Sequence, residues 1–492
     1  MDIFRKKPVQ SVLAGRAENR RGLVPTLNAW DLTALGVGAV IGTGIFVLTG
    51  VAAANYAGPG VIFSFILAGV VSGLAAIVYT ELAAALPVAG SVYTFTYVTM
   101  GEIAAWLVGW NLILEYMVAA GAVAIGWSSY VVDLLRSVGL VFPVSLAASP
   151  FEGGIINLPA IFIAIAVTAL IISGTRESAW VNRIVVTAKL AAIVLFLVIG
   201  IRHINTANWT PLLPFGIAGV FKGAAIVFFA YIGFDAVATA SEEVKNPQRD
   251  LPRGIIYSLI VASVLYVAVA VTLTGMVKYT GLNTASPVAA ALLKAGIPWA
   301  SALVSVGALA GLTSVLLVAM YGQSRIFFAM GRDDLLPPVF DWLHPRLKTP
   351  VWDSLIIGVV VAAIGGLLPI GLVAEMANIG TLSAFMAASA GVMILRRMSP
   401  DLERPFRIPL MPVIPVLTIV SAAYLAVNLP AITWVRFVVW MAIGVAVYFS
   451  YGYGRSALAR SEAAGEEGRR GTIPAPSPAK KPSPGPDGFG ED

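Results

Sequence analysis

The side chains best suited to chemistry are few, and they lie inside long apolar runs. Lys189 is central in a run near 180–202, Glu115 is central in a run near 103–134, and Asp235 lies well inside a run near 218–241. A charged group among apolar neighbours is costly unless it is paired, neutralised or faces a cavity. These three residues are therefore the first candidates for a functional site.

Each of the three has two interpretations. Lys189 lies six residues after Arg183 with apolar residues upstream, so reaching back to a membrane surface would strain its side chain, and we interpret it as a functional lysine. Glu115 is either a site group or a protonated carboxyl bonded to a neighbouring helix. Asp235 lies either in the site or in the cytoplasmic half of its run, where it would hold loop backbone.

Two glycine-containing motifs occur near these residues. Gly36-Val-Gly-Ala-Val-Ile-Gly-Thr-Gly44 has four glycines in nine residues, and Phe228-Phe-Ala-Tyr-Ile-Gly-Phe-Asp-Ala236 has Gly233 among aromatic residues. Glycine allows the backbone to leave helical geometry. At membrane depth, non-helical backbone is tolerated only where it is buried in protein or lines a cavity. Close helix packing also uses small residues, and the first motif alone does not distinguish the two. Because the motifs fall at matching places in two five-helix halves, we predict adjacent breaks near Gly42–Gly44 and Ile232–Gly233.

The elements that must position these residues are apolar and long. The 492 residues are 58% hydrophobic and 12% charged, whereas a soluble domain has about 25% charged residues. A spanning helix requires ~20 apolar residues, and the runs are too long and too uniform for barrel strands. We predict an all-α integral membrane protein with about twelve transmembrane helices, over 29–51, 61–86, 103–134, 157–174, 180–202, 218–241, 253–276, 298–328, 351–370, 372–397, 409–429 and 433–454.

The basic residues predict the orientation of the helices. With the N-terminus inside, cytoplasmic segments up to residue 454 contain nineteen Lys and Arg residues, including Arg16, Arg20 and Arg21, and the outer ends and loops contain six. This bias places both termini in the cytoplasm. We interpret 1–28 as a cytoplasmic segment rather than a signal peptide, and the Pro-, Ser- and charge-rich stretch 455–492 as a disordered cytoplasmic tail.

Composition argues against several other classes of protein. There is no cysteine and no GxxxxGK[ST] phosphate loop, and the two histidines do not form a metal or Ser/His/Asp pattern. The net charge of +6 is explained by the cytoplasmic loops rather than by nucleic acid. The sequence offers no filter loops, which a channel would need, and no nucleophile–base pair, which an enzyme would need. We therefore expect a secondary transporter with no cofactor and no metal.

Several motifs together resemble a known group of transporters. They are Ala34 to Phe46, Phe228 to Asp235, Glu242-Glu-Val-Lys-Asn-Pro247 and Lys189. This combination resembles the amino acid–polyamine–organocation superfamily and, within it, bacterial homologues of the cationic amino acid transporter family. The resemblance extends from about Thr26 to Gly454. It implies a LeuT-type fold of two inverted five-helix repeats, 29–202 and 203–397, with two peripheral helices in 398–454.

The resemblance also implies a function and a site. The implied function is proton-coupled amino acid symport across the cell membrane, and exchange without net proton coupling remains the alternative. The partners would be an amino acid, protons and the bilayer, and an additional small membrane subunit remains open. Backbone N–H groups at Gly42, Thr43 and Gly44 would hold the substrate carboxylate, and the carbonyls of Val40, Phe229, Ala230 and Ile232 would hold its ammonium group.

The role of Lys189 follows from the same resemblance, and the remaining site residues follow from their places in the sequence. Lys189 would replace the cation of sodium-driven relatives, with Thr313 and Ser314 within its reach, and would couple transport to protons. Met320 lies two helical turns beyond Thr313 on the same face and is either a flexible pocket wall or plain core. As a pocket wall, it would shape the space for the substrate side chain together with Glu115. Because this pocket offers little acidity, we expect small neutral amino acids beside cationic ones.

Overall fold

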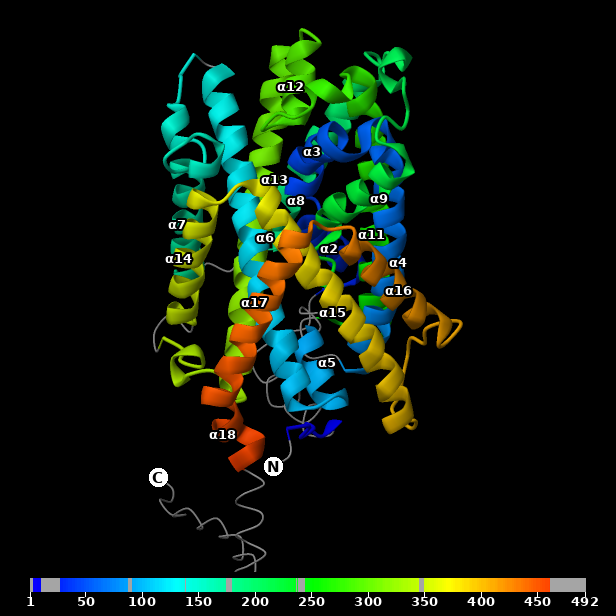
Figure 1. Cartoon of the computed structure of the whole chain (residues 1–492), viewed down its shortest axis with the longest axis vertical. Coiled ribbons are helices and arrows are strands. Elements are labelled where there is room, and N and C mark those ends of the chain that lie inside the picture. Colours follow the sequence, from blue (N-terminus) through cyan, green and yellow to red (C-terminus); the bar gives the residue numbers. More distant parts are fainter. Residues whose placement is uncertain are drawn as a thin grey trace, which may run out of the picture.

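The computed structural model describes residues 3–9, 27–86, 91–137, 139–173, 179–235, 237, 244–344 and 349–460. These residues are helical apart from loops and two isolated β-bridges, Leu27 with Val244 and Ala147 with Asn157. Most of the long helices run along the longest axis of the molecule (Figure 1). The predicted all-helical class therefore holds for the part of the chain that is described.

The helices have the following bounds. The α-helices are α2 (Ala29–Val40), α3 (Thr49–Ala52), α4 (Val61–Ala85), α5 (Ser91–Thr99), α6 (Glu102–Ser137), α7 (Leu158–Ile172), α8 (Ala179–Ile201), α9 (Gly216–Val227), α11 (Pro247–Met276), α12 (Pro287–Lys294), α13 (Pro298–Arg332), α14 (Val351–Leu367), α15 (Ile370–Met398), α16 (Val413–Val427), α17 (Ala431–Val447) and α18 (Tyr453–Arg455). The π-helices are η1 (Gly44–Leu48), η2 (Ala53–Ala57) and η11 (Tyr448–Gly452). The 3₁₀ helices are η3 (Gly58–Gly60), η4 (Val144–Leu146), η5 (Pro150–Glu152), η6 (Thr206–Trp209), η7 (Phe228–Tyr231), η9 (Tyr279–Gly281) and η10 (Pro338–Phe340).

Helix starts follow local sequence signals. Asn28 caps α2 by accepting hydrogen bonds from the N–H groups of Trp30 and Asp31, and the Asp31 carboxylate accepts from the Asn28 N–H in return. This reciprocal arrangement satisfies donors that a helix N-terminus leaves free. Proline occupies the first position of α11, α12 and α13, where its missing N–H costs no helical bond.

Length and composition agree with a membrane protein. Among the described residues, seven helical runs are long and apolar enough to cross a membrane, and five further apolar helices have 10–17 residues. Each of the twelve predicted apolar segments contains helix. The division between the segments 351–370 and 372–397 falls at Pro369, which lies between α14 and α15. The short helices α5 and α12 were not predicted, because neither has the apolar length on which the prediction rested.

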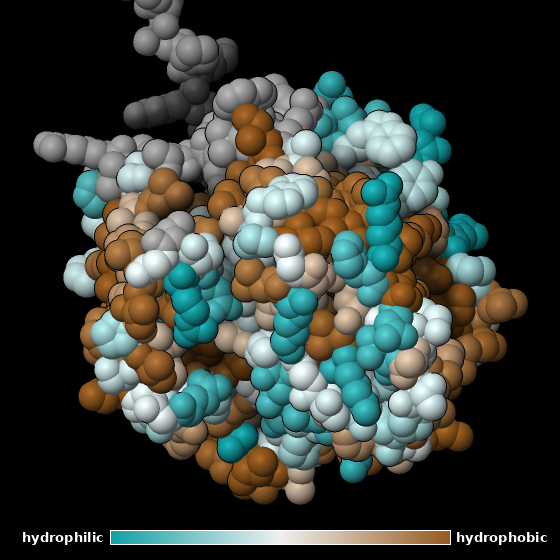
Figure 2. Space-filling model, turned by 90° about the horizontal axis from the view of Figure 1, so that it is seen from above, coloured by the Kyte–Doolittle hydropathy of each residue, from teal (hydrophilic) through white to brown (hydrophobic). Residues whose placement is uncertain are grey.

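Burial separates central helices from peripheral ones. Of an apolar 18-residue window in α6, 89% is buried, against 17% for such a window in the run Ala431–Arg460, which begins with α17. Seen from the end at which α12 lies, hydrophilic side chains are interspersed with apolar ones over the face, and apolar side chains also occupy much of the rim (Figure 2).

The two described ends of the chain meet at one end of the molecule. Residues 3–9 lie beside α18 (Figure 1), where an Arg5 guanidinium N–H donates to the Tyr453 carbonyl at 3.3 Å. The Glu102 carboxylate, at the start of α6, accepts hydrogen bonds from Tyr448 and Ser456. The first and the last described residues therefore lie at the same end of the molecule.

Three predictions fall partly outside the described residues. They concern the tail from residue 461 onward, the leader residues Arg16, Arg20 and Arg21, and Glu242 and Glu243 of the motif after the sixth segment.

Candidate functional site

The helix expected at 29–51 is interrupted at its centre. α2 ends at Val40, Ile41 takes an extended conformation (φ −78°, ψ 100°), and helix resumes as η1 at Gly44. A Cβ atom on Gly44 would lie 2.3 Å from the Cα of Ala230, which is closer than two non-bonded carbon atoms can approach. Glycine at 44 thus permits contact between the first interruption and η7.

The helix expected at 218–241 is interrupted in the same region. α9 tightens into η7, which ends at Tyr231, and Ile232 is extended (ψ 138°). Gly233 has φ +110°, a conformation that favours glycine. A Cβ on Gly233 would lie 3.1 Å from the Ala39 carbonyl oxygen. The two interruptions are therefore adjacent, as the paired motifs predicted.

A buried tyrosine that was not predicted joins the two interruptions. The Tyr266 hydroxyl of α11 lies 2.9 Å from the Val40 carbonyl oxygen and 2.7 Å from that of Ala230, and it donates to both. One phenolic proton is thus shared by two carbonyls from different interruptions. Asn378 of α15 similarly donates to the carbonyls of Ala225 and Ile226, near the end of α9. Nothing in the apolar sequence around either residue singled it out.

Lys189 lies against the first interruption. Its side chain is fully buried, and Nζ donates to the carbonyl oxygens of Gly38 at 2.5 Å and Ile41 at 3.0 Å. The aliphatic stem packs on Gly311 of α13, where a Cβ would lie 2.9 Å from Lys189 Cδ. The ammonium group thus occupies a site built from main-chain oxygens that the interruption releases.

The hydroxyls of Thr313 and Ser314, which were expected to bond to Lys189, have other surroundings. The Thr313 hydroxyl donates to the Leu309 carbonyl at 2.8 Å and accepts from the Trp127 indole N–H at 3.0 Å. The Ser314 hydroxyl is buried and has no hydrogen-bond partner within the described ranges. The hydrogen bonds recorded for Lys189 go to carbonyls rather than to either hydroxyl.

A cavity of about 50 Å³ lies where the two interruptions meet α6 and α13. Seven of the nine residues predicted to bind substrate line it: Val40, Gly42, Thr43, Gly44, Glu115, Phe229 and Ile232. Ala230 is instead buried against Gly44. Met320 is buried in the hydrophobic core, and Val315, Val318 and Ala319 form the α13 wall. Positions 315, 318 and 319 share one helix face, and residue 320 is turned a further 100° or so away from it.

The polar groups of the cavity are mainly acceptors. Among the described residues that line it, the ionisable side chains are Glu115, Tyr116 and Asp235. The Tyr116 hydroxyl donates to Asp235 Oδ2 at 2.9 Å, and Asp235 is among the residues that line the cavity. Glu115 Oε2 and Thr43 Oγ1 are buried without a hydrogen-bond partner in the described part of the chain. Such orphaned buried atoms are rare and call for an explanation.

Comparison with known proteins agrees with this geometry. Residues 27–450 match the family model described as amino acid permease. The chain is similar to the methylthioribose transporter of Bacillus subtilis (strain 168), with 46% identity over 93% of this chain and 99% of the relative. The similarity to the branched-chain amino acid permease BcaP of the same organism is also 46%, over the same shares.

The chain belongs to the amino acid permease family. This confirms the resemblance to the amino acid–polyamine–organocation superfamily. Its similarity to the mouse cationic amino acid transporter 4, 38% identical over 75% of this chain and 59% of that relative, supports the narrower likeness. This permease is accordingly a multi-pass membrane transporter rather than an enzyme, and the interruptions with their cavity are its candidate substrate site.

Proposed function

We propose that this permease is a proton-coupled symporter that binds the α-carboxylate and α-amino groups of an amino acid between the two interruptions. The observation that carries the proposal is the cavity itself, which joins both interruptions and contains an orphaned hydroxyl and an orphaned carboxylate oxygen. A ligand with both donors and acceptors would satisfy Thr43 and Glu115 together.

The proposed binding mode follows from helix electrostatics. The substrate carboxylate would lie at Gly42, Thr43 and Gly44, because the first N–H groups of a resumed helix are free and carry partial positive charge. The ammonium would lie among the carbonyls of Phe229 and Ile232 and the carboxylates of Glu115 and Asp235. The carbonyl of Val40 would contribute its second lone pair, since Tyr266 already bonds to it, whereas Ala230 lies behind the cavity wall.

The cavity walls favour a neutral side chain. Ala119, Val123, Val315 and Val318 are apolar, and one relative at 46% identity is a branched-chain amino acid permease. We therefore favour small or branched neutral amino acids over cationic ones. A second candidate is a neutral thioether sugar, since the other relative at 46% identity transports methylthioribose and carboxylates also accept from hydroxyl groups.

The proposed architecture is a LeuT-type fold with repeats 29–202 and 203–397, peripheral helices in 398–454, and both termini in the cytoplasm of a cell in whose plasma membrane the protein lies. The paired interruptions in corresponding helices support it. Lys189 would be the coupling group. Its ammonium ties α8 to the first interruption, and loss of its proton would release that tie.

Uptake into proteoliposomes tests this function. An imposed inward proton gradient should drive accumulation of a labelled branched-chain amino acid, and unlabelled small or branched amino acids should compete. If methylthioribose competed for uptake and amino acids did not, the second candidate, transport of a thioether sugar, would be supported instead. If accumulation were the same with and without a proton gradient, but required unlabelled substrate inside the liposomes, the protein would be an exchanger.

A further inference from the structure

A second cavity lies at the start of α11 and shares no lining residue with the first. It is an open cavity with a volume of about 550 Å³, bordered by the first turns of α11 and by the segment 399–412 that joins α15 to α16. Arg249 and Arg253 line it from α11, and Pro405 and Phe406 line it from the facing segment. The cavity thus combines two guanidinium groups with an apolar wall.

The cavity continues into an exposed apolar face of α11. Ile260, Val261 and Val264 follow Arg253 and Tyr257 at helical spacing, and they are 54%, 37% and 63% exposed. In a membrane protein such a face is covered by acyl chains. The rings of Tyr257 and Trp30 lie beside one another, with centroids 6.2 Å apart. Because Trp and Tyr concentrate where headgroups meet the acyl region, this pair marks the level of the headgroups.

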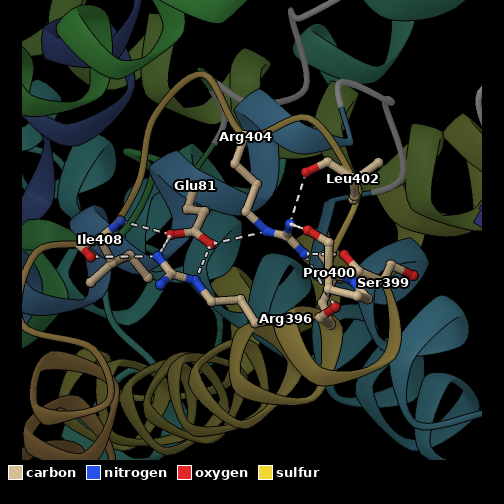
Figure 3. A network of polar contacts seen from close by, with 8 residues as sticks. Glu81, Arg396, Ser399, Pro400, Leu402, Arg404 and Ile408 are labelled. Carbon is tan, nitrogen blue, oxygen red and sulfur yellow. Dashed lines mark hydrogen bonds and ion pairs between the residues drawn. The ribbon is translucent and has the colours of Figure 1, made fainter.

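The facing wall is held rigidly by a buried network (Figure 3). Glu81 of α4 accepts from Arg396 at 2.7 and 2.5 Å and from the Ile408 N–H at 2.7 Å. Arg404 donates to the carbonyls of Leu395, Ser399, Pro400 and Leu402. Since Arg404 and Ile408 flank Pro405 and Phe406, the wall is fixed before any ligand arrives. A ligand would therefore bind without first ordering this segment.

We propose that this cavity binds the headgroup of an anionic phospholipid. Arg249 and Arg253 contact the phosphate, because guanidinium groups match phosphate oxygens in charge and geometry. The acyl chains follow the exposed face of α11. Basic pockets between membrane helices bind anionic headgroups by this chemistry. The bound lipid links α11 to the segment between α15 and α16, in addition to the direct tie that Glu81 makes between α4 and that segment.

Native mass spectrometry of the full-length protein tests this site. The protein in detergent is titrated with phosphatidylglycerol, with phosphatidylcholine of the same acyl chains, or with inorganic phosphate, and the retained molecules are counted. The variants are R249Q/R253Q, which removes both guanidiniums, and Q248E, which places a carboxylate on an exposed lining residue without changing its shape. R332Q/R397Q removes two exposed arginines outside the cavity and serves as the matched control.

The wild type should retain phosphatidylglycerol in preference to phosphatidylcholine. R249Q/R253Q should weaken this retention roughly thirtyfold, since each basic residue near a lipid surface contributes about one kcal/mol, and Q248E should weaken it in the same direction. The control should behave as the wild type. Equal retention by R249Q/R253Q, equal retention of both lipids, or displacement of lipid by equimolar phosphate would overturn the proposal. None of these outcomes depends on which solute is transported.

Discussion

Lys189 and Glu81 are both charged side chains buried in the helix bundle, but their surroundings differ in kind. Lys189 is held by two neutral main-chain carbonyls at an interrupted helix. Glu81 is held by two arginines and one main-chain N–H. When Lys189 loses its proton, the carbonyls that hold it are neutral and no opposite charge is left unpaired. If Glu81 lost its charge, two arginines would be left uncompensated. The Lys189 region is therefore suited to change state during transport, and the Glu81 region is suited to remain fixed.

Apart from Lys189, the largest effect on uptake is expected where the backbones of the two interruptions touch. Gly44→Ala should lower uptake more than about tenfold, because overpacking a backbone contact costs about 1–3 kcal/mol. Uptake and thermal unfolding of the purified variant measure both consequences. Gly371→Ala is the matched control, since an added Cβ there meets nothing within 4 Å. Wild-type uptake by Gly44→Ala would mean that the contact with Ala230 is not required.

Glu81→Gln should affect stability rather than transport. Removing one partner of a buried ion pair costs about 3–5 kcal/mol, so we expect a lower unfolding temperature, with uptake per folded molecule retained. The exposed Glu403→Gln, from the same connecting segment, should change stability by less than about 0.5 kcal/mol. If Glu81→Gln unfolded like the wild type but had lost transport, the proposed division between a switching and a fixed region would be reversed.

Tyr266→Phe should have an intermediate effect. It removes the hydroxyl that bonds to one carbonyl from each interruption. An unsatisfied buried acceptor costs about 1–3 kcal/mol, so substrate affinity should fall roughly tenfold through a less ordered site. Equilibrium binding of labelled substrate measures this change, with Tyr424→Phe on α16 as an exposed control. An affinity unchanged by Tyr266→Phe would show that the interruptions keep their geometry without the bridge.

Thr313→Val should have the smallest effect. The hydroxyl makes two hydrogen bonds, donating to Leu309 and accepting from Trp127, and neither involves Lys189. Proton-driven uptake should therefore change by less than about threefold, which corresponds to about 0.7 kcal/mol. Uptake at several proton gradients measures this. Loss of gradient dependence in this variant would extend the coupling site to α13.

The sequence predicted the features that rest on backbone chemistry. Gly44 and Gly233 occupy positions that only glycine fills easily, so the interruptions could be located, and Lys189 was conspicuous because a lone charge in an apolar helix requires partners. Tyr266 and Met320 show what could not be predicted. Tyr266 resembles any core tyrosine until the fold brings two carbonyls to its hydroxyl. Met320 was assigned to the pocket from helix spacing, but the rotation of α13 about its axis is set by packing and turns Val318 and Ala319 toward the cavity instead.

The central claim is that Lys189 couples transport to protons through the carbonyls of Gly38 and Ile41. Lys189→Met keeps an unbranched side chain that is one atom shorter and removes its charge. Proteoliposome uptake with and without an inward proton gradient should show no gradient-dependent accumulation in this variant, while substrate binding to the purified protein persists. Replacing the exposed Lys222 in the same way should leave accumulation intact. Gradient-driven accumulation by Lys189→Met equal to that of the wild type would contradict the claim.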